Sequence, residues 1–148
     1  MPTGARPRIL CVDDHEDSRL MLVTLLQLAS IEAKAVGTAA QALSLIQAEH
    51  FDLYMLDGRL PEMDGFELCR RMRAADSQIP ILFFSAAAYE ADKRKGIEAG
   101  ANDYVIKPNI FELMRTTKRL MSRNIRQPEI HHWAELLPLS PAREMHQG

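Results

Sequence analysis

The sequence predicts an α/β fold in which helices cover both faces of a parallel five-stranded sheet. Short apolar runs alternate five times with longer segments of helical periodicity, which is the pattern of repeated strand–helix units. The runs are apolar along nearly their whole length, as expected for strands that are covered on both sides. With 148 residues, 47% of them hydrophobic, the chain is long enough for one domain with a packed core.

The first two strand–helix units lie in the first third of the chain. RILCV at 8–12 predicts a buried strand, and the helical pattern over 16–30 has acidic residues before and within its first turn. AKAVG at 33–37 predicts a weaker second strand. The alanine-rich segment 39–50 predicts the second helix, and Thr38 before it is a suitable N-cap because its hydroxyl can accept a backbone N–H.

The third and fourth units follow the same order. FDLYMLD at 51–57 predicts a strand, and Asp64 is placed to cap a helix over 65–74. IPILFFS at 79–85 is strongly apolar and predicts the fourth strand. A helix over 89–99 follows, and the glycine after it is a typical C-terminal stop.

The fifth unit begins with NDYVIK at 102–107, which predicts the last strand. Pro108 ends this strand, and Asn109 is placed to cap a helix over 110–123. Right-handed crossovers leave few topologies for such a series of units. A flavodoxin-like, doubly wound sandwich with strand order 2-1-3-4-5 fits best.

The chain changes character after residue 123. Residues 8–123 are therefore expected to form the domain, and residues 124–148, with three prolines and no strand pattern, a C-terminal tail. Within the tail, a short amphipathic helix is expected at about 129–137 because Pro128 suits a helix start and Trp133 shares a face with nearby apolar residues.

Composition and charge narrow the functional classes. The net charge of −2 and the pI of about 6.2 give no electrostatic footprint for direct binding to nucleic acid. The longest apolar stretch, 20–29, is half of the ~20 residues that span a bilayer, and the N-terminus has no signal-peptide pattern. Cys11 and Cys69 form no paired motif and are expected to be reduced core residues. These features predict a cytoplasmic protein without membrane contact.

Polar side chains stand where the apolar strands end. Asp13 and Asp14 follow the first strand, and the third, fourth and fifth strands end in Asp57, Ser85 and Lys107. In an open parallel sheet, ligands bind outside the carboxyl ends of the strands. We therefore expect three carboxylates, one hydroxyl and one ammonium group to converge on one edge of the sheet.

The chemistry of such a group is restricted by charge. Two carboxylates ~4 Å apart repel by about 4 kcal/mol at an effective dielectric constant of 20. A hard divalent cation, Mg²⁺ or Mn²⁺, relieves this repulsion because it prefers oxygen ligands. A phosphoryl group is a suitable further ligand, and Ser85 and Lys107 would hold its other oxygens. Asp57 is then a candidate nucleophile that forms an aspartyl phosphate.

Four motifs at these strand ends resemble the receiver domain of two-component response regulators, of the stand-alone, chemotaxis-regulator-like type. They are VDD at 12–14, LDGRLPEMDG at 56–65, SAA at 85–87 and DYVIKP at 103–108. The resemblance extends over roughly residues 8–123. Each motif alone is weak evidence, but all four stand at the appropriate strand ends.

The resemblance implies roles at the acidic group. Asp57 would accept the phosphoryl group. Asp14 would bind Mg²⁺ directly, Asp13 mostly through water, and Arg59 through its backbone carbonyl. His15 is next to the acidic pair in the sequence and is expected to face solvent rather than the site.

The resemblance also implies a switch. Ser85 would move toward the phosphoryl group and Lys107 would pair with one of its oxygens. Tyr104 would swing inward when Ser85 moves. The Lys107–Pro108 peptide bond would be cis.

The expected partners follow from the same resemblance. A histidine kinase or histidine phosphotransfer protein would donate the phosphoryl group, and a downstream protein would read the switched surface. A homodimer through the fourth helix, fifth strand and fifth helix is a further expectation. The domain would catalyse only its own phosphorylation and dephosphorylation, and would otherwise not be an enzyme.

Three alternatives remain open. The short tail after the domain favours a stand-alone receiver. The first alternative is that the chain is a receiver fragment of a larger regulator or hybrid histidine kinase. A degenerate receiver that acts only as a binding module is the second alternative. The third, an aspartyl-phosphate phosphohydrolase, is disfavoured because the segment Asp57-Gly58-Arg59 lacks the second aspartate of the D-x-D motif that haloacid-dehalogenase-type enzymes use.

Overall fold

A computed structural model of the chain describes residues 6–125. The strands are β1 (Arg8–Val12), β2 (Glu32–Val36), β3 (Leu53–Leu56), β4 (Ile81–Ser85) and β5 (Asp103–Ile106). The helices are α1 (Glu16–Leu28), α2 (Ala39–Ala48), α3 (Gly65–Ala75), α4 (Glu90–Ala99) and α5 (Ile110–Ile125). The helix expected at about 129–137 lies outside the described residues.

The five strands form one parallel sheet in the order β2-β1-β3-β4-β5, which confirms the predicted flavodoxin-like fold. All residues of β3 and β4 are buried. This burial explains why their sequences are continuous apolar runs rather than alternating ones.

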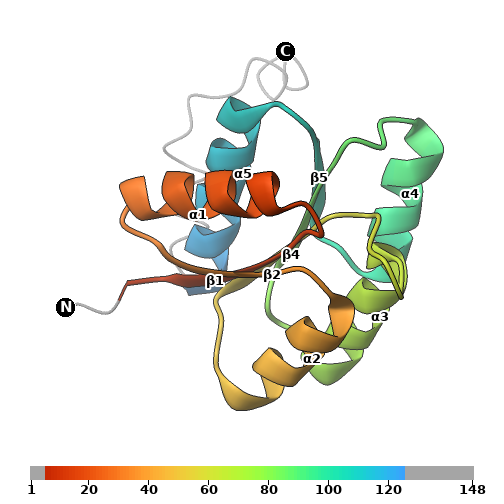
Figure 1. Cartoon of the computed structure of the whole chain (residues 1–148), viewed down its shortest axis with the longest axis horizontal. Coiled ribbons are helices and arrows are strands. Elements are labelled where there is room, and N and C mark those ends of the chain that lie inside the picture. The colour runs from red at the N-terminus through yellow and green to blue at the C-terminus, as the bar shows by residue number, and fades with distance from the viewer. Residues whose placement is uncertain (1–5, 126–148) are drawn as a thin grey trace, which may run out of the picture.

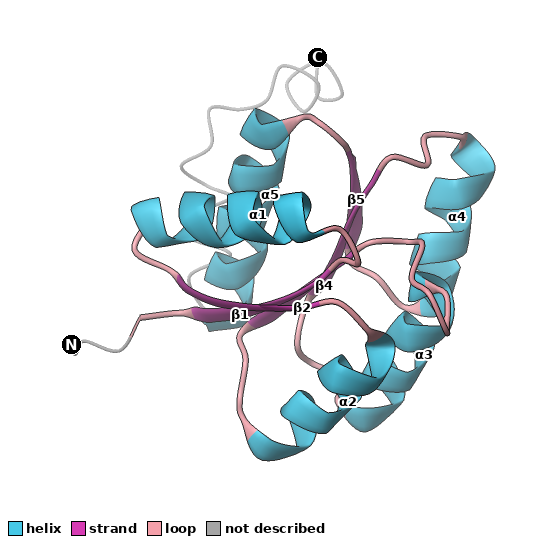
Figure 2. Ribbon diagram, in the orientation of Figure 1, coloured by secondary structure: helices cyan, strands magenta, loops and turns pink. Residues whose placement is uncertain are grey.

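Helices cover both faces of the sheet, as Figures 1 and 2 show. Helices α1 and α5 lie on one face, where Leu26 and Leu113 belong to a core cluster with Ile9 and Cys11 of β1. Helices α2, α3 and α4 lie on the opposite face, over a second cluster built around residues such as Phe83. Within residues 6–125, no helix combines the length and the apolar character needed to cross a bilayer.

The three helix N-caps expected from the sequence are present. The side chains of Thr38, Asp64 and Asn109 accept hydrogen bonds from backbone N–H groups three residues further on, at 3.1, 2.8 and 3.0 Å. Helix α1 differs, because His15 is its N-cap and makes no side-chain capping bond. The backbone N–H of His15 instead donates to Asp13 Oδ1 at 2.9 Å. The acidic residues before α1 therefore serve the site rather than the cap.

Helix α1 ends at Leu28, two residues earlier than the sequence predicts. Ser30 adopts a left-handed backbone conformation with φ of 65°. Its N–H donates to the carbonyl of Gln27 at 2.9 Å, and the N–H of Ile31 donates to that of Leu26 at 2.9 Å. This pair of bonds is a Schellman motif, which usually contains glycine at the left-handed position. Serine there gave no sequence signal for the end of the helix.

Both cysteines lie in the core, as predicted. Cys11 and Cys69 are fully buried and are free thiols. Burial raises the pKa of Cys11 to about 12 and that of Cys69 to about 11. The thiols are therefore protonated and inaccessible at neutral pH.

Candidate functional site

The parallel ladders continue one residue beyond the strands and so place the polar side chains at one edge. The N–H of Asp13 donates to the carbonyl of Val36 at 3.0 Å, and that of Asp57 donates to the carbonyl of Val12 at 2.9 Å. On the other side of β3, the N–H of Lys107 donates to the carbonyl of Ser85 at 2.9 Å. Backbone pairing thus brings together residues that are up to 94 positions apart.

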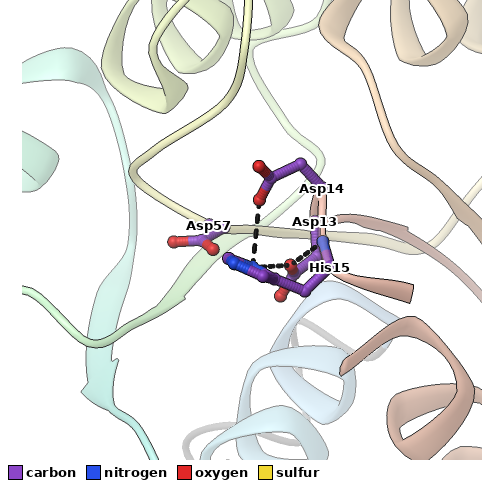
Figure 3. A group of neighbouring side chains, drawn as sticks. All are labelled: Asp13, Asp14, His15 and Asp57. Atoms are coloured by element: carbon purple, nitrogen blue, oxygen red, sulfur yellow. Dashed lines mark hydrogen bonds and ion pairs between the residues drawn. The ribbon is translucent and has the colours of Figure 1, made fainter. Parts of the chain in front are cut away.

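Four side chains at this edge form a group of candidate metal ligands, which Figure 3 shows. One ligand atom from each of Asp13, Asp14, His15 and Asp57 lies within 4.8 Å of the others. Asp13 and Asp57 are 2% and 6% exposed, whereas the Asp14 side chain is 34% exposed. The three predicted carboxylates are therefore brought together, two from within the protein and one from its surface.

Lys107 partly neutralises this group. Its Nζ atom lies 2.8 Å from Asp13 Oδ2 and 3.3 Å from Asp57 Oδ2. Burial alone would lower the pKa of Lys107, but the hydrogen bonds and charges of the two aspartates outweigh it and raise the pKa. The lysine is therefore charged. Three carboxylates and one ammonium group leave an excess of negative charge and several oxygen donors, which fits a hard divalent cation. The Lys107–Pro108 bond is cis, as expected.

The backbone after Asp57 is held against the start of α3. The N–H of Gly65 donates to the carbonyl of Gly58 at 2.9 Å. A Cβ atom on Gly65 would lie 2.0 Å from the backbone oxygen of Asp57, so only glycine fits this approach. The N–H of Arg59 reaches back to Asp57 Oδ1 at 3.4 Å. The loop therefore keeps the backbone of Arg59 beside the acidic group.

Ser85 and Tyr104 meet at one residue, Ala87. The N–H of Ala87 donates to Ser85 Oγ at 3.2 Å, and the hydroxyl of Tyr104 donates to the carbonyl of Ala87 at 2.8 Å. Ser85 is 1% exposed and Tyr104 is 9% exposed, with the tyrosine ring stacked on Phe83 at 5.5 Å between centroids. Burial raises the pKa of the Tyr104 hydroxyl. Ser85 and Tyr104 are thus connected through the two peptide groups that flank the Ala87 Cα atom.

The position of His15 agrees only in part with the expectation from the sequence. Its side chain is 69% exposed, as expected for a solvent-facing residue. Nevertheless its Nδ1 atom lies 3.1 Å from Asp14 Oδ1 and 3.3 Å from Asp13 Oδ1. The position of His15 directly after Asp13 and Asp14 in the sequence was the one indication that it could contact the site. The direction of its ring depends on the turn into α1, which the sequence pattern does not give.

The fold and the site together define a phosphoacceptor domain of two-component signalling. The family model described as "Response regulator receiver domain" matches residues 9–118, and the chain belongs to this family. In receiver domains, phosphorylation takes place in the acidic pocket, which in this chain contains Asp13, Asp14 and Asp57. Receiver domains are signalling domains rather than enzymes that act on an external substrate.

Two curated relatives illustrate the similarity in sequence. The chain is 37% identical over 124 residues to the DNA-binding response regulator MtrA of Mycolicibacterium smegmatis, covering 83% of this chain and 54% of that protein. It is 35% identical over 108 residues to the sensor protein EvgS of Escherichia coli K12, covering 73% of this chain and 9% of that protein. The chain thus spans about half, or much less, of the length of these relatives.

Solved structures agree with this assignment. A putative response regulator from Chloroflexus aurantiacus is 34% identical, with a TM-score of 0.76 over 80% of this chain and 100% of the other. The receiver domain of sensor histidine kinase PA1611 from Pseudomonas aeruginosa PAO1 is 29% identical, with a TM-score of 0.73 over 80% of this chain and 99% of the other. That receiver domain was solved with a magnesium ion coordinated in its active-site cleft.

Proposed function

We propose that residues 8–123 act as a response-regulator receiver in a phosphorelay, in which Asp57 accepts a phosphoryl group from a histidine kinase or histidine phosphotransfer protein. A carboxylate oxygen of Asp57 forms a bond to phosphorus as the bond between phosphorus and the donor histidine nitrogen breaks. The donor imidazole keeps the electron pair and takes up a proton. The position of Lys107 between Asp13 and Asp57 is the main support, because it supplies positive charge beside the acceptor oxygen.

The acidic group fits Mg²⁺, or Mn²⁺, as the resident cofactor. Asp13, Asp14 and Asp57, together with the backbone carbonyl of Arg59, would hold the ion. When bound, the ion neutralises negative charge on the carboxylates and on the phosphoryl oxygens. The magnesium ion in the related PA1611 receiver domain supports this assignment.

Ser85 and Lys107 would bind the phosphoryl oxygens after transfer. The Ser85 hydroxyl is close to the acceptor loop, since a Cβ on Gly58 would lie 3.3 Å from its Oγ atom. If Ser85 turns to the phosphoryl group, its Oγ atom no longer accepts the hydrogen bond from the Ala87 N–H. Ala87 is then less firmly held, and its carbonyl is the hydrogen-bond partner of the Tyr104 hydroxyl. A change from 1:99 to 99:1 between two states of this surface requires about 5.5 kcal/mol, which two or three charge-assisted hydrogen bonds supply in order of magnitude.

The output of this switch is proposed to be protein contact in the cytoplasm. The surface formed by α4, β5 and α5 would bind a downstream protein or a second copy of the chain. Tyr104 lies on β5 and packs under α4, where a Cβ on Gly96 would lie 3.0 Å from its ring. A change in the Tyr104 ring would therefore alter the shape of this surface. The same contacts would apply to a receiver within a larger regulator or hybrid kinase.

Phosphorylation of the whole chain by acetyl phosphate with Mg²⁺ tests the proposal. We expect intact-protein mass spectrometry to show the addition of one phosphoryl group to the wild type and to Glu62→Gln, an exposed control in the same loop. Asp57→Asn should show none. Beryllofluoride with Mg²⁺ should change the NMR signals of Ser85 and Tyr104 only when Asp57 is present. An unmodified wild type, or equal labelling of Asp57→Asn, would refute the proposal.

A further inference from the structure

We propose that His15 is an additional ligand of the acidic site and gives it affinity for nitrogen-preferring divalent cations such as Zn²⁺ and Co²⁺. This inference rests on the proposed function, because it concerns the same metal position. It adds a residue of a different chemical type to a site whose other donors are oxygen atoms. The consequence is a receiver whose metal preference differs from that of an all-oxygen site.

The geometry of the His15 ring is the first support. Its Nδ1 atom lies 3.1 Å from Asp14 Oδ1 and 3.3 Å from Asp13 Oδ1, and the ring faces the carboxylates in Figure 3. The candidate ligand atoms of all three residues and of Asp57 lie within 4.8 Å of one another. A single cation can therefore contact the nitrogen and the carboxylates after only small side-chain adjustments.

The backbone holds His15 in this position. Its N–H donates to Asp13 Oδ1 at 2.9 Å, and it is the N-cap residue of α1 with an extended backbone. The carbonyl of His15 accepts from the N–H of Arg19 at 3.0 Å, which is the first bond of the helix. Because the backbone is fixed on both sides, binding a cation orders little beyond the exposed ring itself.

The donor set determines which cations gain from this residue. Mg²⁺ prefers carboxylate, carbonyl and water oxygens, so an imidazole contributes little to its binding. Zn²⁺ and Co²⁺ bind imidazole nitrogen well, and for a given set of N and O ligands their affinities exceed that of Mn²⁺. His15 should therefore affect the binding of these ions much more than the binding of Mg²⁺.

A simple hydrogen bond between the imidazole and the carboxylates is the competing interpretation. In that case the ring occupies the space of the cation and opposes every metal equally. Removal of the ring would then strengthen the binding of Mg²⁺ and Co²⁺ alike. The two interpretations therefore predict changes of opposite sign for Co²⁺.

Calorimetric titrations of the full chain with Co²⁺, Zn²⁺ and Mg²⁺ at one pH distinguish them. We expect His15→Ala to weaken Co²⁺ and Zn²⁺ binding by about tenfold or more, as for the loss of a metal-site residue, and Mg²⁺ binding by less than about twofold. The visible absorption of bound Co²⁺ should change in the same variant. His15→Asn, which introduces a side chain suited to capping α1, should behave like His15→Ala and provides the measurement should the alanine variant fold poorly.

Matched variants separate this site from the other histidines. His50→Ala removes an exposed histidine that pairs with Asp52 instead, and a combined change of His131, His132 and His146 to alanine removes the three histidines in the C-terminal part of the sequence. Both should retain the wild-type Co²⁺ affinity at this site, and excess Mg²⁺ should displace the Co²⁺. Co²⁺ affinity that is unchanged or higher in both His15 variants would overturn the inference. Failure of the wild type to be phosphorylated would count against the proposed function, but it would leave these metal affinities interpretable.

Discussion

Lys107 Nζ lies closer to Asp13 than to Asp57, the proposed phosphoacceptor, at 2.8 Å against 3.3 Å. The Asp13 side chain is 2% exposed and that of Lys107 is 19% exposed, so this contact is only partly accessible to water. The lysine is therefore shared between two carboxylates. Under the proposed function, a phosphoryl group on Asp57 would compete with Asp13 for Lys107, which would couple the phosphoryl group to the ends of both β1 and β5.

Replacing the charge of Lys107 should change metal affinity. We expect Lys107→Met to increase the affinity for Mg²⁺ by about tenfold, or about 1.4 kcal/mol, because a positive charge beside Asp13 and Asp57 is removed. Lys107→Arg keeps the charge and should remain near the wild-type affinity. Calorimetric titration with Mg²⁺ measures both, and an unchanged or weaker affinity of the methionine variant would show that Lys107 does not oppose the cation.

Gly65→Ala should destabilise the domain. The new Cβ atom would lie 2.0 Å from the backbone oxygen of Asp57, and neither backbone can move freely. We expect the free energy of unfolding to fall by about 2–3 kcal/mol, as in other overpacked sites, when it is measured by urea denaturation. Gly37→Ala is the control, since the nearest atom to its Cβ would be the end of the long Arg19 side chain at 2.8 Å, which can move more easily than backbone. Equal losses in the two variants would contradict this explanation.

The hydroxyl of Tyr104 should contribute to stability, unlike that of an exposed tyrosine. Tyr104→Phe loses the hydrogen bond to the carbonyl of Ala87, and we expect a loss of about 1 kcal/mol in the free energy of unfolding. Tyr89, which is 80% exposed, provides the control, and Tyr89→Phe should change the free energy of unfolding by much less. If Tyr104 reports on Ser85, Tyr104→Phe should also reduce the NMR changes that beryllofluoride causes in α4. An unaltered response would separate Tyr104 from the switch.

The stability contributed by Glu49 should depend on pH. Hydrogen bonds from Arg8 and Lys34, at 2.7 Å each, lower the pKa of Glu49 below its ordinary value of 4.5. A carboxyl whose folded-state pKa is depressed stabilises the fold fully above the unfolded-state pKa, and this contribution is lost as the pH falls through the folded-state pKa. We therefore expect Glu49→Gln to unfold at lower urea concentration than the wild type at pH 7.

The difference between Glu49→Gln and the wild type should shrink as the pH falls below the ordinary pKa of 4.5 and then through the lower folded-state pKa, at which Glu49 becomes protonated in the fold. Glu62→Gln changes an exposed glutamate and serves as the control at each pH. A difference that stays constant from neutral to acidic pH would show that the lost contact is not electrostatic.

Much of the fold could be predicted because its signals are local. Apolar runs, helical periodicity and the caps at Thr38, Asp64 and Asn109 each depend on neighbouring residues, and the structure contains all of them. Helix α1 was predicted two residues too long because serine, unlike glycine, is not typical of the left-handed conformation that Ser30 adopts.

The side chains at the functional edge could likewise be predicted from the sequence. In a parallel sheet the end of each strand points to the same side, so the positions of Asp57 and Lys107 along the chain were enough to bring them together. How these side chains contact one another could not be predicted in the same way. The closer approach of Lys107 to Asp13 and the shared contact of Ser85 and Tyr104 at Ala87 depend on register and on packing between distant segments, which no local pattern encodes. The direction of the His15 ring depends on the backbone of the turn into α1, which the residue types alone do not fix.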